Sequence, residues 1–152
     1  MHQFLVGTTS VVIRAAQFGE IVDLRHAVLR AGMPHEAAVF PGDDAATTHH
    51  FGAFVYGTTV GCATFHLNQW ENEAAWQLRG MATDDAFRGR GVGGAMLGFA
   101  ENFLLSNRPV RLFWCNARTP AVRFYQKQGW KVVSEEFVIE TAGPHVKMIK
   151  RT

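Results

Sequence analysis

Cysteine is scarce in this sequence: Cys62 and Cys115 are the only two in 152 residues, and they match no metal-ligand spacing. Each lies in an apolar run, which favours two buried free thiols in a reducing compartment over a disulfide framework. The histidines, including His35 and the pair His49-His50, also lack a recognised ligand spacing, so we expect no metal site.

Long hydrophobic runs and a strong charge of either sign are also missing. No segment approaches the length of a membrane-spanning helix, and the N-terminal stretch has no basic region before an apolar one. The formal net charge is only +2, which implies no extended field for binding polyanions. We therefore expect a cytoplasmic protein that binds neither a membrane nor nucleic acid.

What is present suits one domain spanning residues 1–152, with 47% hydrophobic and 18% charged residues. Hydrophobic periodicity, β-branched runs and Gly/Pro breaks predict strands at 10–15, 49–56, 59–67, 73–83, 110–116, 130–140 and 145–151. They predict helices over 18–30, from about 91 to 104, and from 119 to Gly129. This order indicates a mixed-sheet α/β domain.

The turn at residues 88–94, RGRGVGG, places four glycines and two arginines directly before a helix. A helix N-terminus presents unpaired N–H groups and a partial positive charge, and glycines let an anion approach them. Arginine adds forked donors that suit phosphate oxygens. The turn therefore indicates a pyrophosphate site rather than a plain exposed connection.

Two common phosphate motifs fit poorly. Gly89-x-Gly91-x-x-Gly94 matches the spacing of a dinucleotide fingerprint, but residues 84–87 separate it from its strand and no acidic residue follows at the required distance. A P-loop is excluded because no Gly-Lys-[Ser/Thr] is present. A nucleotide- or RNA-binding module that uses the Gly/Arg-rich turn without catalysis is the alternative function.

In another register the same turn reads Arg88-x-x-Gly91-x-Gly93, which resembles the [Q/R]-x-x-G-x-[G/A] signature of the GNAT superfamily of acetyl-CoA-dependent N-acetyltransferases. Upstream, LRGMATDDAFRG resembles the family's fourth strand and the loop into its pyrophosphate site. Downstream, NARTPAVRFYQKQGW resembles its fifth strand end and following helix. The resemblance covers the order of elements from about 11 to 151, with specific motifs between 78 and 130.

The resemblance implies a mostly antiparallel central sheet of about seven strands flanked by helices, with the fourth and fifth strands splayed. Acetyl-CoA would enter that gap, and the enzyme would transfer its acetyl group to a primary amine of a small molecule or peptide by direct attack. The residues implied to bind the cofactor are Met81, Thr83, Arg88, Gly89, Arg90, Gly91, Val92, Gly93, Gly94 and Asn116.

The resemblance assigns Tyr125 a catalytic role, as the acid that protonates the departing thiolate. Taken from its own residues, the Phe-Tyr pair is typical of a packed aromatic on an amphipathic helix. Asn116 lies nine residues earlier and Gly129 four residues later, which matches the family pattern and favours the acid role.

The chain departs from the family at the general base. Several members use a glutamate four residues before the Met81 position, where this sequence has Gln77. The candidates that remain are Glu73, His66 and His145, and each of them is also an ordinary structural or exposed residue. A base is dispensable if the amine has a low pKa or a water chain carries the proton.

The acceptor cannot be named from the sequence. By resemblance its site lies roughly at 33–48 and 137–145, whose acids would suit a cationic amine or would form a solvated rim: Glu36, Asp43, Asp44 and Glu140. Because family members often dimerise, the resemblance also leaves a homodimer open.

Overall fold

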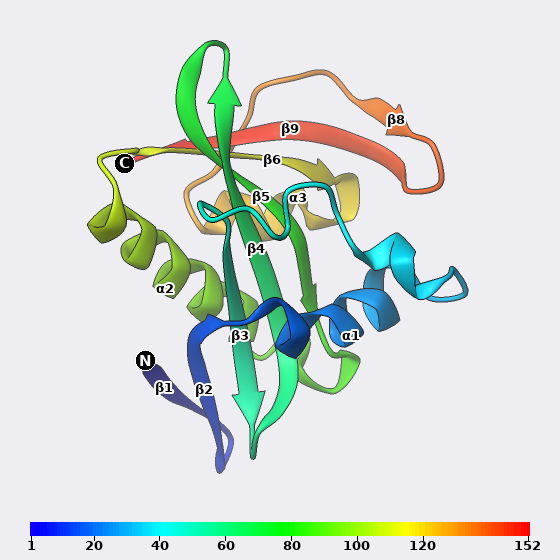
Figure 1. Cartoon of the computed structure of the whole chain (residues 1–152), viewed down its shortest axis with the longest axis vertical. Coiled ribbons are helices and arrows are strands. Elements are labelled where there is room, and N and C mark those ends of the chain that lie inside the picture. Colours follow the sequence, from blue (N-terminus) through cyan, green and yellow to red (C-terminus); the bar gives the residue numbers. More distant parts are fainter.

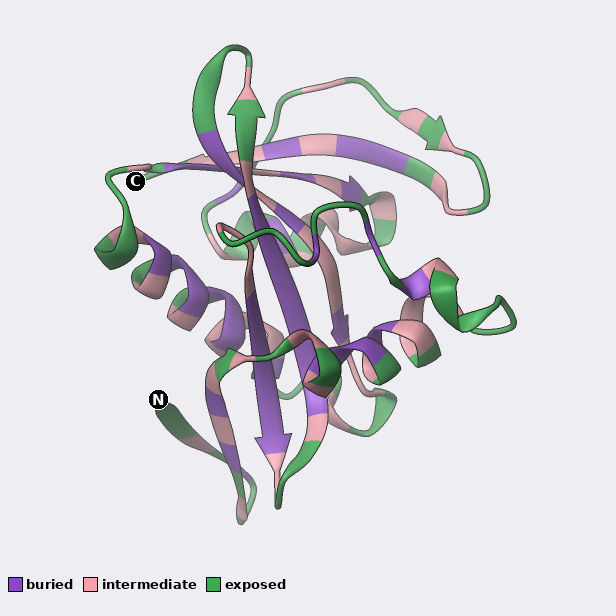
Figure 2. Ribbon diagram, in the orientation of Figure 1, coloured by how far each residue is buried: buried purple, intermediate pink, exposed green.

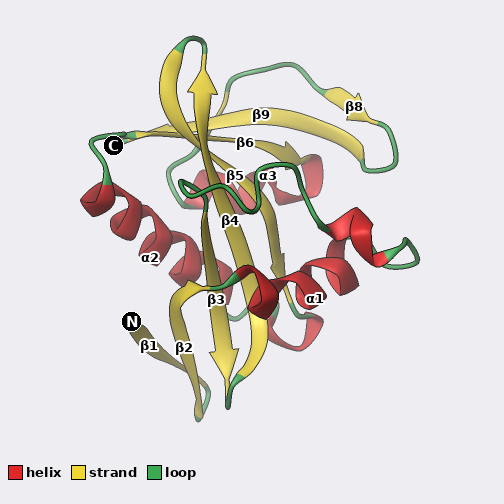
Figure 3. Cartoon of the chain, viewed as in Figure 1, coloured by secondary structure: helices red, strands yellow, loops and turns green.

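One sheet of nine strands organises the computed structural model, which describes residues 1–152 (Figures 1 and 3). The strands are β1 (His2–Val6), β2 (Thr9–Ala16), β3 (His49–Val55), β4 (Thr58–Trp70), β5 (Glu73–Thr83), β6 (Leu112–Arg118), β7 (Lys131–Val132), β8 (Phe137–Ile139) and β9 (Gly143–Arg151). The helices are α1 (Phe18–Leu29), α2 (Val92–Asn107) and α3 (Val122–Lys127), with 3₁₀ turns η1 (His35–Ala38), η2 (Asp85–Phe87) and η3 (Thr119–Ala121). No helix combines the length and hydropathy needed to span a membrane.

The strand order is β1-β2-β3-β4-β5-β6-β9-β7, and β8 also pairs with β9. All neighbours are antiparallel except β5 and β6, which pair in parallel over only three residues, from Trp76–Phe113 to Leu78–Cys115. Beyond Leu78 the two strands are no longer paired. Figure 1 shows the result: β6 and β9 run across the molecule while β3, β4 and β5 run along it. The expected splay of the two strands is therefore present.

The helices cover the two faces of the sheet. Apolar residues of α2 pack with those of β2 to β6 in the main core, which includes Ile13, Phe51, Phe65, Trp76, Met96 and Leu97. A smaller cluster under α1 joins Ile21 to Cys62 and Ala82 on the other face. Figure 2 shows that burial is concentrated along the central strands and on the sheet-facing side of α2.

A β-bulge in β5 changes which residues face each side. Thr64 pairs with Arg79 and Cys62 pairs with Ala82, so Gly80 and Met81 together oppose one residue of β4. Gly80 adopts φ +64°, which favours glycine, and a Cβ there would lie 2.7 Å from Nε of Arg25. Trp76 and Leu78 face the main core, whereas Ala82, after the bulge, belongs to the α1 cluster.

Most of the predicted elements are confirmed, including the strand at 73–83 and the helix after the glycine turn. Three expectations were wrong in detail. The sheet has nine strands instead of about seven, because β1 was not predicted and residues 130–140 form two short strands, β7 and β8. The helix expected from 119 begins as the 3₁₀ turn η3 before α3.

Candidate active site

The first of two adjoining hollows lies at the N-terminus of α2. It encloses about 510 Å³, and its wall combines the glycine turn with β5 and α3. The predicted residues that line it are Met81, Thr83, Arg88, Gly89, Gly91, Val92, Gly93 and Gly94. Eight of the ten predicted cofactor-binding residues are thus brought to one place.

The glycines of the turn are required by its geometry. Gly89 and Gly91 have φ of +70° and +87°, and Gly91 is the N-cap of α2. A Cβ on Gly93 would lie 3.3 Å from the ring of Phe124, and one on Gly94 would lie 3.0 Å from the Gln128 amide. Side chains at Gly93 and Gly94 would therefore crowd Phe124 and Gln128, which line the hollow. The cradle therefore fits an extended anionic ligand that approaches the α2 N–H groups.

The two arginines of the turn are placed differently. Arg88 lines the hollow, with Nε 3.2 Å from the Asp85 carboxylate and 3.4 Å from the carbonyl oxygen of Thr83. Arg90 is exposed and does not line the hollow. Arg88 is thus the arginine on the wall of this hollow, and the cofactor contacts predicted for Arg88 and Arg90 stay predictions.

A second hollow, of about 260 Å³, adjoins the first where β5 and β6 separate. Four residues line both hollows: Leu29, Met81, Ala121 and Tyr125. The Tyr125 side chain is buried, packs 5.5 Å from the Trp130 ring centroid, and donates a hydrogen bond to the Met81 sulfur. Burial raises the pKa of the Tyr125 phenol, so the hydroxyl stays protonated at neutral pH.

Asn116 lies in the second hollow and not in the first. Its amide oxygen accepts a hydrogen bond from Nζ of Lys147 at 3.0 Å, so the amide N–H groups are its remaining donors. The cofactor contact predicted for Asn116 stays a prediction.

Two of the three candidate bases lie outside both hollows. Glu73 is exposed at the start of β5 and binds Arg151 through two hydrogen bonds of 2.9 and 3.1 Å, which lower the pKa of its carboxyl group. His66 is buried beside Asp43, and burial lowers the pKa of its imidazole. Neither side chain has access to an acceptor in the second hollow.

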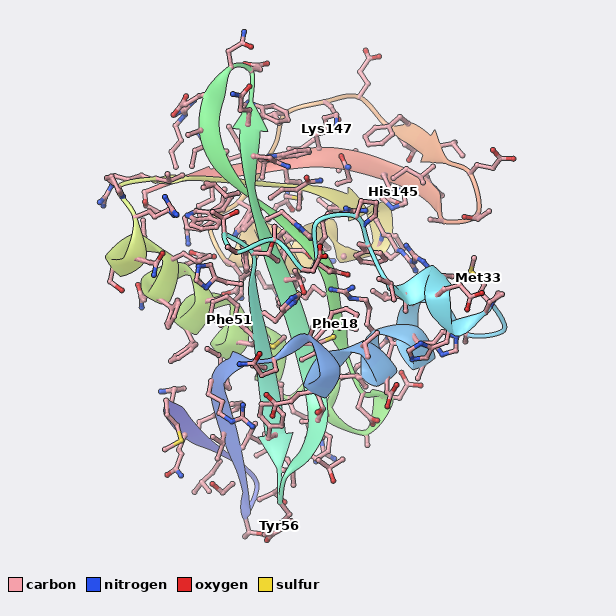
Figure 4. All side chains as sticks on the ribbon, viewed as in Figure 1. Phe18, Met33, Phe51, Tyr56, His145 and Lys147 are labelled. Carbon is pink, nitrogen blue, oxygen red and sulfur yellow. The ribbon has the colours of Figure 1, made fainter.

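His145, the third candidate, lines the second hollow. It lies near the start of β9, opposite Arg118 of β6, and Figure 4 labels it together with Lys147 of the same strand. Its Nδ1 is 2.8 Å from the carbonyl oxygen of Gly143. Because a carbonyl only accepts, Nδ1 carries the proton and Nε2 of the neutral ring has a free lone pair. The geometry suits proton acceptance.

Comparison with known proteins agrees with this geometry. The family model described as "Acetyltransferase (GNAT) family" matches residues 13–130. The chain is 31% identical over 141 residues to the uncharacterized N-acetyltransferase YitI of Bacillus subtilis (strain 168), covering 91% of this chain and 94% of that protein.

The chain belongs to the GNAT family of acetyltransferases.

Solved structures place the fold in the same group. Escherichia coli ElaA superposes with a TM-score of 0.80 at 18% identity, covering 93% of this chain and 99% of that one. An aminoglycoside 6'-N-acetyltransferase complexed with coenzyme A superposes with a TM-score of 0.73 at 14% identity, covering 92% and 96%. As a GNAT enzyme, the chain is an N-acetyltransferase with a CoA-based acyl donor.

The family match includes the glycine turn. An acetyltransferase domain is therefore favoured over a non-catalytic nucleotide- or RNA-binding module. Both cysteines are buried and free, as expected. Burial raises the pKa of each thiol to about 12, so both are protonated at neutral pH. Cys115 lines the second hollow but is not a thiolate nucleophile.

Sequence reasoning missed several residues of this GNAT site. Arg30, Phe40, Arg79 and Arg118 all line the second hollow. The one available signal was position: Arg79 precedes Met81 by two residues on the predicted strand, and Arg118 follows Asn116 by two. Arg30 and Phe40 come from segments whose path relative to the sheet no local pattern determines.

Proposed function

We propose that this enzyme transfers an acetyl group from acetyl-CoA to the primary amine of a small molecule or peptide by direct attack. The observation that carries the proposal is the junction of the two hollows at Met81 and Tyr125. One hollow suits a pyrophosphate-bearing arm and the other a small acceptor. The reacting carbon would lie where they meet. Acetyl-CoA supplies a thioester whose carbonyl carbon accepts the amine.

Backbone groups of β5 would hold the acyl end of the donor. Gly80 and Met81 lie outside the register with β4, and the pairing of β5 with β6 ends at Leu78. A backbone N–H group in this gap would bind the carbonyl oxygen, on which negative charge develops during attack. Thr83, two residues after Met81 and in the first hollow, would bind the pantetheine arm.

His145 is proposed as the general base. Its Nε2 takes the proton that the amine loses as the new C–N bond forms, directly or through one water. The Gly143 carbonyl fixes the tautomer through Nδ1. His145 would therefore do the work for which other family members use a glutamate at the Gln77 position.

Tyr125 acts on the leaving group. As the C–S bond breaks, its hydroxyl donates a hydrogen bond to the sulfur, which departs as a thiolate and then takes a proton from solvent to become the free thiol. Full proton transfer from Tyr125 is opposed because a buried phenolate is costly, which is also why burial raises its pKa. Hydrogen-bond donation is thus the main contribution.

Direct transfer is favoured over an acyl-enzyme route. The cysteine that lines the second hollow is Cys115, whose raised pKa of about 12 keeps it a neutral thiol. The thiolate, not the thiol, attacks thioesters. Amine attack therefore needs no covalent enzyme intermediate.

The test is a thiol-release assay with acetyl-CoA against amino acids, polyamines, aminoglycosides and peptide N-termini. We expect amine-dependent release of CoA and an acetylated product of matching mass. No release with any amine, combined with no calorimetric binding of CoA, would overturn the proposal.

A further inference from the structure

The second hollow carries only positive formal charge. Its charged lining residues are Arg30, Arg79 and Arg118, and no aspartate or glutamate lines it. None of these three guanidinium groups forms an ion pair with a carboxylate. Arginine remains charged at physiological pH even when partly buried. The hollow therefore holds three cations and no counter-ion.

Two of the three guanidinium groups, those of Arg30 and Arg79, lie over the ring of Phe40. The guanidinium carbon of Arg79 lies 4.7 Å from the ring centroid, and that of Arg30 lies 5.2 Å from it. Stacking on an aromatic ring orients a guanidinium group and leaves its N–H donors free at the edges. Burial, followed by repulsion from Arg118, Arg79 and Arg25, lowers the pKa of Arg30, as expected when guanidinium groups crowd together.

The nearby acids are already engaged or absent from the hollow. Asp43 binds the buried Arg25 at 2.7 and 3.2 Å and also accepts from the backbone N–H of Phe40. Glu36, Asp44 and Glu140, which the sequence suggested for a cationic acceptor, are exposed and do not line the hollow. A polycationic acceptor would thus meet three positive charges without a partner.

We infer that the acceptor of this enzyme carries an oxyanion, a carboxylate or a phosphate, close to the amine that is acetylated. Arg79 and Arg118 bind that oxyanion, with Arg30 contributing from the end of α1. Forked guanidinium donors match both oxyanions. The inference rests on the proposed function, since it names the substrate class of the same site.

The size of the hollow limits the rest of the acceptor. At about 260 Å³ it is smaller than most drug-binding pockets, which run from about 300 to 1,000 Å³. Arg79 is two residues from Met81, across the bulge at Gly80, and both residues line this hollow. The amine and the oxyanion therefore belong to one small molecule, such as an amino acid, in preference to an aminoglycoside.

The experiment compares acceptors that differ only in the anion. Thiol release with acetyl-CoA is measured for glycine, β-alanine and γ-aminobutyrate against their amides, for phosphoethanolamine against ethanolamine, and for spermidine. We expect the best carboxylate or phosphate acceptor to exceed its neutral partner by at least about tenfold in kcat/KM, as loss of a charge-assisted hydrogen bond implies. The amino acid pairs test a carboxylate, and the phosphoethanolamine pair tests a phosphate.

Variants then assign the effect to the arginines. Arg79→Gln and Arg118→Gln should each raise KM for the anionic acceptor at least about tenfold while changing its neutral partner little. Arg123→Gln removes the same charge from an exposed position on α3 outside both hollows, and it should leave both acceptors unchanged. Arg118 is exposed, so its variant serves even if Arg79→Gln misfolds. CoA affinity should be the same in all of them.

Different results would overturn the inference about the substrate and the proposed acetyl transfer. If amine-dependent release occurs but neutral or cationic amines equal the anionic ones, or the arginine variants affect both members of a pair alike, the substrate inference is overturned and the proposed function stands. If no amine supports release and CoA does not bind, both are overturned.

Discussion

The phenolic oxygen of Tyr125 lies 3.7 Å from the thioether sulfur of Met81 and donates its one hydrogen bond to it. Thioether sulfur is a weak acceptor, so a better partner would displace it readily. Both side chains line both hollows. If the acyl donor runs from the first hollow toward the second, its thioester sulfur would pass the junction that Tyr125 lines. The hydroxyl could then donate to that sulfur.

The glycine turn predicts a specific defect in cofactor binding. Gly93→Val would place a branched side chain against Phe124 in the first hollow, so CoA affinity should fall by at least about tenfold. Gly98→Val is the matched control, because a Cβ at Gly98 of the same helix meets nothing within 4 Å. Calorimetry should show micromolar or tighter CoA binding in the parent and in the control. Equal affinity in all three proteins would place the cradle elsewhere.

His145→Gln tests the base. Glutamine keeps polarity and approximate size but cannot take a proton, so kcat should fall by about 100- to 10,000-fold if chemistry limits turnover. CoA affinity should not change, since His145 lines only the second hollow. His2→Gln, at an exposed residue of β1, controls for loss of a histidine. Parent-like turnover in His145→Gln would show that solvent or the amine itself disposes of the proton.

Asp43→Ala should cost about 3–5 kcal/mol in the free energy of unfolding, because it leaves Arg25 buried without its carboxylate partner. The neighbouring Asp44 is exposed and forms no ion pair, so Asp44→Ala should change stability by less than about 0.5 kcal/mol. Urea unfolding of both variants makes the comparison. Similar losses in the two proteins would mean that the buried pair contributes little.

Only part of the candidate site could be predicted from the sequence. The hollow at the glycine turn was predictable because its glycines, arginine and helix start are contiguous in residues 88–94, so a local pattern brings them together. The second hollow was not, since Arg30, Phe40 and Arg118 come from three separate segments. Only the tertiary path of the chain brings them to β5. The same limit applied to the base: Glu73, His66 and His145 were equal candidates until the structure placed one of them, His145, in the same hollow as Tyr125.

The strand pattern failed where segments are short. Residues 130–140 contain enough β-branched and aromatic residues to suggest one strand, yet β7 pairs over only two residues and β8 over three. Both short strands pair with β9. No local pattern in residues 130–140 indicates where that pairing stops and resumes. The bulge at Gly80 was similarly hidden, although it lies between Arg79, which lines only the second hollow, and Met81, which lines both.

The raised thiol pKa values predict chemical inertness. Because the pKa of Cys62 and Cys115 is raised to about 12, the folded protein at pH 8 should hold both as neutral thiols and react negligibly with a disulfide reagent. Denaturation lowers both pKa values toward about 8.5 and should expose two reactive thiols. Intact mass after incubation with acetyl-CoA should show no acetylated enzyme. A stable acetyl adduct that an amine removes would contradict direct transfer.

The central claim is that acyl transfer takes place at the junction of the two hollows, beside the Tyr125 hydroxyl. Tyr125→Phe keeps the buried ring and removes only that donor, and Tyr56→Phe changes the one other tyrosine, which is 95% exposed at the tip of the β3–β4 hairpin (Figure 4). The decisive measurement is kcat under saturation with both substrates, with CoA affinity measured in parallel. We predict that kcat falls by at least about tenfold in Tyr125→Phe, while CoA affinity is unchanged and Tyr56→Phe behaves like the parent. Parent-like kcat in Tyr125→Phe, with the chemical step shown to be rate-limiting, would contradict it.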